Sequence, residues 1–126
     1  MSNQVLSYRD LVVWQKALAL AANCYRKTKT LPASETYGMT SQIRRAAASI
    51  PANIAEGNGR ENTGYYIQFL RIAQGSLKEL ETHVLLAETV ELFTNETSEE
   101  LLLECETVGK LLRALIRALQ AKEARP

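Results

Sequence analysis

The amino-acid sequence predicts an all-α fold, in which a single domain over residues 1–126 forms an up-down-up-down antiparallel four-helix bundle. Ala and Leu dominate the 126 residues, whereas aromatic residues make up only 6% of them. Four segments repeat apolar residues at three- and four-residue steps, and no window alternates strictly as a half-buried strand does. The connections between these segments are short, which favours antiparallel neighbours. Residues 1–6 and 121–126 are expected to be loose tails.

The first helix is predicted to begin at a cap formed by Ser7 and to run to about Lys29. Asp10 follows Ser7 by three residues, which is a spacing typical of helix N-termini. The stripe expected to face the core comprises Leu11, Trp14, Leu18, Ala21 and Tyr25.

The second helix is predicted over about residues 35–57, after a cap at Ser34. Pro51 lies inside this segment, and a kink is expected there because proline lacks an amide hydrogen and its ring clashes with the preceding turn. Gly57 and Gly59 are expected to end the helix, since glycine tolerates the left-handed conformation of a helix C-terminus.

The circumference of this second helix is unusual for a helix that faces water. When successive residues are placed about 100° apart, the apolar stripe comprises Met39, Ile43, Ala46, Ala47, Ile50 and Ile54. The polar stripe beside it comprises Gln42, Arg45, Ser49, Asn53 and Glu56. The remaining face carries Arg44, Ala48, Pro51 and Ala55. Because a helix that is apolar or small on most sides is usually buried, the pattern predicts burial against other copies of this short chain.

The third and fourth helices show the most regular patterns. The third is predicted from Asn62 or Thr63 to about Leu92, with a core stripe of Tyr66, Leu70, Ala73, Leu77, Leu80, Val84 and Ala87. Its opposite face carries Gln68, Arg71, Gly75, Lys78 and Thr82. After a turn over residues 94–98, Thr97 and Glu100 have the spacing of a capping box. The core stripe of the fourth helix comprises Leu101, Cys105, Val108, Leu112, Leu115 and Leu119.

Charge and cysteine content narrow the class of protein. The net charge is +1, which weighs against a dedicated high-affinity nucleic-acid module but permits local basic patches. Cys24 and Cys105 occupy apolar helical positions, which favours buried free thiols over a disulfide. The N-terminus lacks the features of a signal peptide, and no apolar run approaches the ~20 residues of a membrane span. We therefore expect a cytoplasmic protein with no membrane partner.

Several stretches resemble one known family. They are Tyr8-x-x-Leu11-x-Val13-Trp14-Gln15-Lys16-Ala17, Tyr37-Gly38-x-x-Ser41-Gln42-Ile43-Arg44-Arg45-Ala46, Ser49-Ile50-Pro51-Ala52-Asn53-Ile54-Ala55-Glu56-Gly57 and Phe69-Leu70-x-Ile72-Ala73-x-Gly75-Ser76-Leu77-x-Glu79-Leu80-Glu81. The chain from about Tyr8 to Leu119 thereby resembles the S23 family, the four-helix-bundle proteins encoded in intervening sequences of bacterial 23S ribosomal RNA genes.

The resemblance implies a four-helix protomer that assembles as a homopentamer. The family is similar in fold to the accessory protein of diversity-generating retroelements, which binds nucleic acid and a reverse transcriptase. That similarity is one of fold alone. No enzymatic activity is established for the family.

The polar stripe of the second helix admits two interpretations. Together with Ser76 and Glu79 of the third helix, its members Gln42, Arg45, Ser49, Asn53 and Glu56 would form either a ligand or catalytic pocket or a buried hydrogen-bond network. Because buried charges must be paired, Arg45 is expected to contact Glu56 or Glu79. The network interpretation, in which these side chains fix helix register or subunit pairing, is favoured because the two carboxylates lie within plausible reach of Arg45.

Catalytic, metal and cofactor sites find little support. His83 follows Glu79 by one turn, but a di-iron bundle needs two Glu-x-x-His pairs and the chain has one histidine. Ser49 and Ser76 lack a nucleophile elbow and an acid-histidine partner set. Neither glycine-rich phosphate motif is present. We therefore expect no metal, no cofactor and no enzymatic activity.

Basic side chains on outward positions of the second, third and fourth helices are the remaining candidates. They are Arg44, Arg60, Arg71, Lys78, Lys110, Arg113 and Arg117. In a single copy these residues would form an ordinary solvent-exposed surface. A cyclic assembly, in contrast, would repeat them around a ring and concentrate positive electrostatic potential there. The function expected first is a non-enzymatic oligomeric scaffold that binds RNA or DNA phosphate. The alternative is an adaptor for a protein partner such as a polymerase, and a small-molecule enzyme ranks third.

Overall fold

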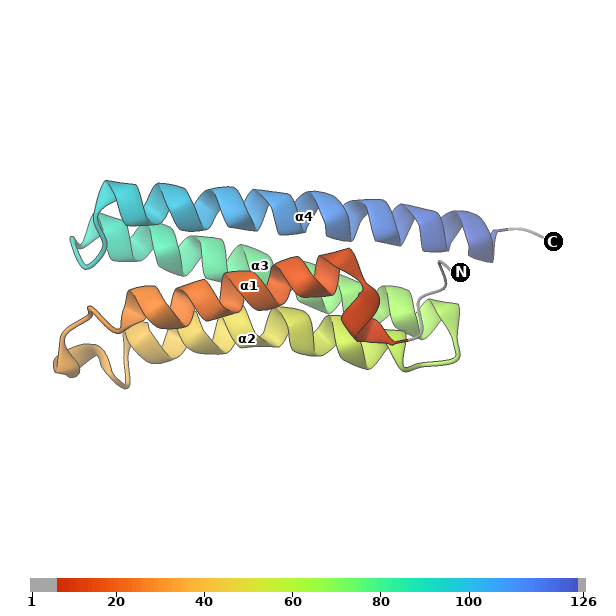
Figure 1. Ribbon diagram of the computed structural model, residues 1–126, viewed down its shortest axis with the longest axis horizontal. Coiled ribbons are helices and arrows are strands. Elements are labelled where there is room, and N and C mark those ends of the chain that lie inside the picture. The colour runs from red at the N-terminus through yellow and green to blue at the C-terminus, as the bar shows by residue number, and fades with distance from the viewer. Residues whose placement is uncertain (1–6, 125–126) are drawn as a thin grey trace.

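The computed structural model describes residues 7–124, which form an antiparallel bundle of four α-helices. The helices are α1 (Val12–Thr28), α2 (Met39–Asn58), α3 (Thr63–Thr89) and α4 (Asn95–Glu123), and they alternate in direction (Figure 1). Two short 3₁₀ helices, η1 (Tyr8–Asp10) and η2 (Ala33–Glu35), precede α1 and α2. Each helix packs on its sequence neighbours, and α1 also packs on α4, which closes the bundle. The predicted all-α class is therefore confirmed.

The core lies between the four helices and is almost entirely aliphatic. Its largest fully buried side chains are Leu20, Ile43, Ile50, Ile54, Leu70, Leu77, Leu80, Leu101 and Leu112. The predicted core stripe of α3 is confirmed, and so are the first four positions of the α4 stripe. Cys24 and Cys105 are buried free thiols, as the sequence predicts.

The first helix differs from the prediction at both its start and its core face. Ser7 and Asp10 do form a capping box, but it caps η1, and α1 begins only at Val12. The buried face of α1 comprises Val13, Ala17, Leu20, Ala21 and Cys24. Of the predicted stripe only Ala21 is fully buried, whereas Leu18 and Tyr25 are exposed. The predicted stripe is one position out of phase because α1 carries apolar residues on two adjacent faces.

The ends of α2 also differ from the prediction. The helix begins at Met39, whose amide donates to Glu35 Oε1 at 3.0 Å, so Ser34 is not its cap. At its other end no glycine of the described chain has a positive φ, so the expected left-handed termination is wrong. Gly57 instead lies inside the helix, where α3 approaches closely: a Cβ there would be 2.7 Å from Phe69 Cβ. Pro51 is buried within the helix.

The turn between α3 and α4 contains the one non-glycine residue with positive φ among residues 7–124, Glu91 at 65°. The Leu92 amide donates to Ala87 O at 2.8 Å across this residue, which is the pattern of a Schellman motif. The Thr94 side chain accepts from the Thr97 amide and caps α4, so the capping box expected at Thr97 is wrong. The helix then continues to Glu123, which corrects the loose tail expected from residue 121; residues 1–6 lie outside the described part.

Among residues 7–124, no helix is both long and apolar enough to cross a membrane.

Candidate functional site

Five of the seven predicted basic residues gather on the side of the bundle formed by α3 and α4. Lys78 and Arg113 line two adjoining grooves between these helices, with volumes of about 310 and 260 Å³. Arg71 precedes Lys78 by seven residues, and Arg117 follows Arg113 by four, so both extend the same faces. Lys110, one turn before Arg113, is exposed beside them. We call these five residues the basic face.

Most of the basic face is available to an anion. Lys78 donates to Glu81 at 3.1 Å, but its side chain is 72% exposed, so this pair is well hydrated. Within residues 7–124 the other four members form no ion pair, although all are exposed. Gly109 lies in the middle of the face, where a Cβ would be 3.3 Å from Leu77 Cδ2. The absence of a side chain there lets α4 approach α3 and leaves the grooves open between the cationic groups.

Arg44, on α2, does not belong to this face. Its Nε donates to Thr28 Oγ1 at 2.8 Å, and its Nη2 donates to the Tyr25 carbonyl at 3.2 Å. Its guanidinium also lies 4.7 Å from the centroid of the Tyr25 ring. These contacts fasten α2 to the C-terminal end of α1, so Arg44 has a structural role here.

Arg60 is also engaged inside the protomer. Its Nη2 donates to Glu56 Oε2 at 3.1 Å, and its guanidinium lies 5.1 Å from the centroid of the Phe69 ring. It lies between α2 and α3, at the end of α2, and not on the α3/α4 side. Arg60 therefore links the end of α2 to the first part of α3.

The polar stripe of α2 is not buried within one protomer, so the predicted network would have to form between copies. Gln42, Arg45, Glu56 and Glu79 are exposed, and Ser49, Asn53 and Ser76 are half-buried. The one hydrogen bond that joins two of these residues within residues 7–124 runs from Asn53 Nδ2 to the Ser49 carbonyl at 2.7 Å. Arg45 pairs neither with Glu56, which pairs with Arg60, nor with Glu79, whose Oε2 lies 3.9 Å from His83 Nε2. The stripe lies toward the outer side of the α2–α3 contact, where its charged members are exposed.

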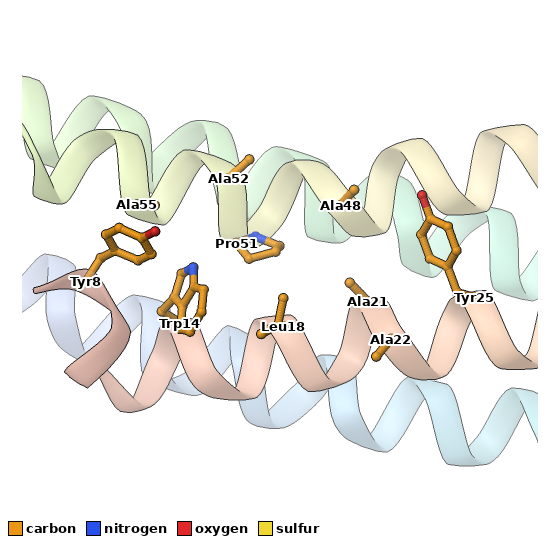
Figure 2. Close-up of a pocket in the computed structure, with 10 residues that line it drawn as sticks. All are labelled: Tyr8, Trp14, Leu18, Ala21, Ala22, Tyr25, Ala48, Pro51, Ala52 and Ala55. Carbon is orange, nitrogen blue, oxygen red and sulfur yellow. The ribbon is translucent and has the colours of Figure 1, made fainter.

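A second surface is an apolar groove between α1 and α2, and its α1 side includes Trp14, Leu18, Ala21 and Tyr25 of the predicted core stripe (Figure 2). It has a volume of about 470 Å³ and comprises Tyr8, Trp14, Leu18, Ala21, Ala22, Tyr25, Ala48, Pro51, Ala52 and Ala55. Trp14 and Leu18 project from α1 toward α2, where the Pro51 ring faces them. This α1/α2 groove includes Ala48, Pro51 and Ala55, the small residues of α2 from which the sequence predicts burial against other copies.

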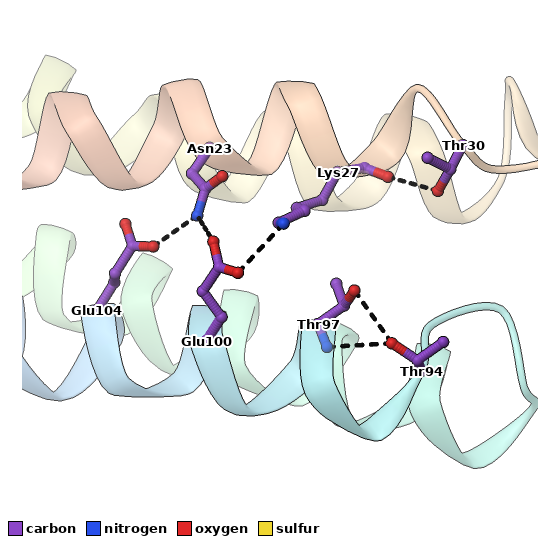
Figure 3. Close-up of polar contacts among 7 residues, drawn as sticks. All are labelled: Asn23, Lys27, Thr30, Thr94, Thr97, Glu100 and Glu104. Carbon is purple, nitrogen blue, oxygen red and sulfur yellow. Dashed lines mark hydrogen bonds and ion pairs between the residues drawn. The ribbon is translucent and has the colours of Figure 1, made fainter.

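Polar contacts between α1 and α4 occupy part of the acidic first half of α4 (Figure 3). Asn23 Nδ2 donates to Glu100 Oε2 at 2.7 Å and to Glu104 Oε2 at 2.5 Å, and Lys27 Nζ lies 3.1 Å from Glu100 Oε1. The hydrogen bonds from Asn23 and Lys27 lower the pKa of Glu100. Beneath these contacts, burial raises the pKa of the Cys24 thiol to about 12, and the Glu104 carboxylate adds to this shift. The pKa of Cys105 is raised as well, chiefly by burial. Neither thiol has the thiolate character that nucleophilic chemistry needs.

Comparison with known proteins identifies one family and one informative structural neighbour. The family model described as 23S rRNA-intervening sequence protein matches residues 9–114. A solved structure of a protein with unknown function from the S23 ribosomal protein family of Bacteroides thetaiotaomicron is similar to this chain, with 29% sequence identity and a TM-score of 0.75. The similarity covers 83% of this chain and 98% of that one. No functionally curated protein matches the sequence.

Proposed function

The chain belongs to the 23S rRNA-intervening sequence protein family, and on this premise we propose that it is a non-enzymatic, oligomeric helical scaffold that binds RNA or DNA phosphate. The contact surface is the basic face on α3 and α4. The observation that carries this proposal is the convergence of Arg71, Lys78, Lys110, Arg113 and Arg117 on one side, four of them without an ion pair in residues 7–124.

The chemistry of the basic face suits the phosphate backbone and not the bases. Guanidinium groups bind phosphate oxygens in bidentate fashion. Along the basic face no aromatic side chain accompanies the cations, so stacking on bases contributes nothing there. Binding is therefore expected to be indifferent to sequence and to weaken steeply with salt, because each phosphate contact releases roughly 0.7–0.9 of a counterion.

Self-association through the α1/α2 groove is the second part of the proposal. The groove exposes Trp14, Leu18 and Tyr25 opposite the alanines of α2, and burial of such a surface favours assembly by about 25 cal/mol per Å² of apolar area. A cyclic assembly, with the homopentamer as the expected form, would repeat the basic face around the ring and raise the local positive potential. The small net charge of +1 is compatible with this, because five of the 15 basic residues lie on the basic face.

Nucleic-acid binding is tested by fluorescence anisotropy with a labelled structured RNA at low and at moderate salt. The double variant Arg113→Gln/Arg117→Gln should weaken binding at least tenfold. The slope of the logarithm of the binding constant against the logarithm of salt concentration should fall by the amount expected for roughly two phosphate contacts. Lys16→Gln, which removes an exposed cation from α1, is the matched control and should bind as the unmodified chain does. Absence of RNA binding by the unmodified chain at low salt would overturn the proposal.

Self-association has its own measurement, which is the mass of the assembly by light scattering. Leu18→Glu places a charge in the α1/α2 groove without touching the buried face of α1, so it should yield a folded protomer of single-chain mass. A single-chain mass for the unmodified protein would instead favour the alternative function, an adaptor whose groove binds a different protein.

A further inference from the structure

The acidic first half of α4 carries an apolar groove that has no role in the proposed function. Glu99, Leu102, Leu103 and Glu106 line it, and its volume is about 360 Å³. Leu103 is 65% exposed, the highest value among the exposed large aliphatic side chains of residues 7–124. Leu102 is half-buried and joins this surface to the core. An exposed leucine between two carboxylates is costly to keep in water and gains nothing within the protomer.

A third leucine extends this surface across the helix boundary. Asn95 Nδ2 donates to Glu88 Oε2 at 2.9 Å, and Gly109 packs against Leu77, so the register of α3 against α4 is known at two levels. Along the bundle axis Leu85 lies between those two levels, at about the height of Glu99. Leu85 follows Lys78 by seven residues, so it lies on the same face of α3, which lines the α3/α4 grooves. Leu85 is 49% exposed. We call Leu85, Glu99, Leu102, Leu103 and Glu106 the leucine patch.

The charges of the leucine patch are uncompensated. Glu100 and Glu104, on the α1 side of α4, are occupied by Asn23 and Lys27. Glu99 and Glu106, in contrast, form neither an ion pair nor a hydrogen bond within residues 7–124. Glu106 also lines the neighbouring groove with Arg113, but the two side chains are not paired. A partner that covers the leucines must therefore approach two free carboxylates.

We propose that the leucine patch is a docking surface for a cationic amphipathic helix of a partner protein. The exposed leucines of the patch can pack against the apolar side of a partner helix whose apolar residues repeat at i, i+3, i+4 and i+7. Lysine or arginine side chains flanking that apolar ridge would pair with Glu99 and Glu106, whereas the same carboxylates repel nucleic acid and acidic segments. A second copy does not supply this ridge from its cationic segment, because the second half of α4 buries its apolar residues Leu112 and Ile116 in its own core.

The proposal is tested on the full chain with a fluorescein-labelled peptide of about 18 residues made of Leu and Lys in that helical pattern. A peptide of the same pattern with Glu in place of Lys is the matched control. The Leu-Lys peptide should bind and the Leu-Glu peptide should not. Leu103→Ala should weaken binding at least tenfold. Glu99→Gln/Glu106→Gln should weaken binding and flatten its salt dependence, because the flanking ion pairs are lost.

Two control variants show whether the leucine patch itself is the site. Leu18→Ala removes an exposed leucine from the α1/α2 groove, and Glu96→Gln removes an exposed carboxylate from α4 outside the patch. Both should leave the affinity nearly unchanged, and all variants should retain the melting curve of the unmodified chain because the altered side chains are exposed. Hydrogen exchange should slow over residues 99–106 when the peptide binds. Failure of the Leu-Lys peptide to bind, or equal loss of affinity in Leu18→Ala, would overturn the proposal. Neither result bears on RNA binding by the basic face.

Discussion

Gly57 lies where α3 packs tightly against α2, and replacing it with alanine should destabilise the protein. A Cβ at this position would be 2.7 Å from Phe69 Cβ, 3.0 Å from Tyr66 Cδ1 and 3.2 Å from the Tyr66 carbonyl. Ordinary van der Waals contacts of a Cβ atom begin near 3.4 Å, so the new Cβ and the Phe69 Cβ must move apart by about 0.7 Å. The first and third of these atoms are attached to or part of the α3 backbone, so the helix itself must move.

The size of the effect follows from two opposing terms. Overpacking of a well-packed contact costs about 1–3 kcal/mol. Alanine recovers at most about 1 kcal/mol of helix propensity, and less near the end of α2. The free energy of unfolding should therefore fall by roughly 1–2 kcal/mol for Gly57→Ala, which corresponds to a drop of about 3–8 °C in Tm.

Gly75 provides the matched comparison, because it lies in the middle of α3 and a Cβ there meets no atom within 4 Å. Gly75→Ala should raise the free energy of unfolding by about 0.5–1 kcal/mol through helix propensity alone. Urea unfolding followed by circular dichroism measures both values on the same scale. The reasoning is refuted if Gly57→Ala is as stable as the unmodified chain, or if Gly75→Ala is the less stable of the two.

Three further outcomes are expected. Glu91→Gly should stabilise the chain by about 1 kcal/mol in urea unfolding, since glycine accepts the positive φ of this position without strain; no gain would show that the Glu91 side chain compensates. Because burial raises the pKa of Cys24 to about 12 and also that of Cys105, both thiols favour folding below their unfolded pKa of 9.0, and this contribution is lost as the pH rises above it. A thiol reagent at about pH 8 should label them only in denaturant, and fast labelling of the native chain would contradict their burial. The Asn23 and Lys27 hydrogen bonds lower the pKa of Glu100, so they stabilise the fold above its unfolded value of 4.5 and less as the pH falls through it. Glu100→Gln should flatten the acid limb of a stability-against-pH curve, and an unchanged limb would rule out this contribution.

The sequence was most informative where a helix has one apolar face. Every predicted core position of α3 is buried or half-buried, and its predicted outer residues Arg71, Gly75 and Lys78 are exposed. Periodicity alone determines orientation in such a helix. In α1 it does not, because Trp14 and Leu18 form one apolar face and Leu20 and Cys24 form another. A single helix cannot show which of two adjacent faces meets the core of its own chain.

Local chemistry was less predictable than helix position. Thr94 and Thr97 both offer a hydroxyl before an acidic segment, and only the turn geometry places Thr94 at the cap. Among the basic residues, spacing indicated exposure but not partners. Arg44 lies 19 residues from Tyr25 along the chain, and the contact between them depends on the packing of α1 on α2. The polar stripe stays a prediction for a related reason, since its burial requires a partner surface that one copy does not supply.

The side chains that hold the four helices together are largely distinct from those that line the α1/α2 groove. Ala21 and Pro51 belong to both groups, Trp14 packs against the core, and the Tyr25 ring contacts the Arg44 guanidinium. Leu18, in contrast, is exposed and lies outside the core. Substitutions at Leu18 would therefore change the surface of the groove while leaving the packing of the four helices unaltered.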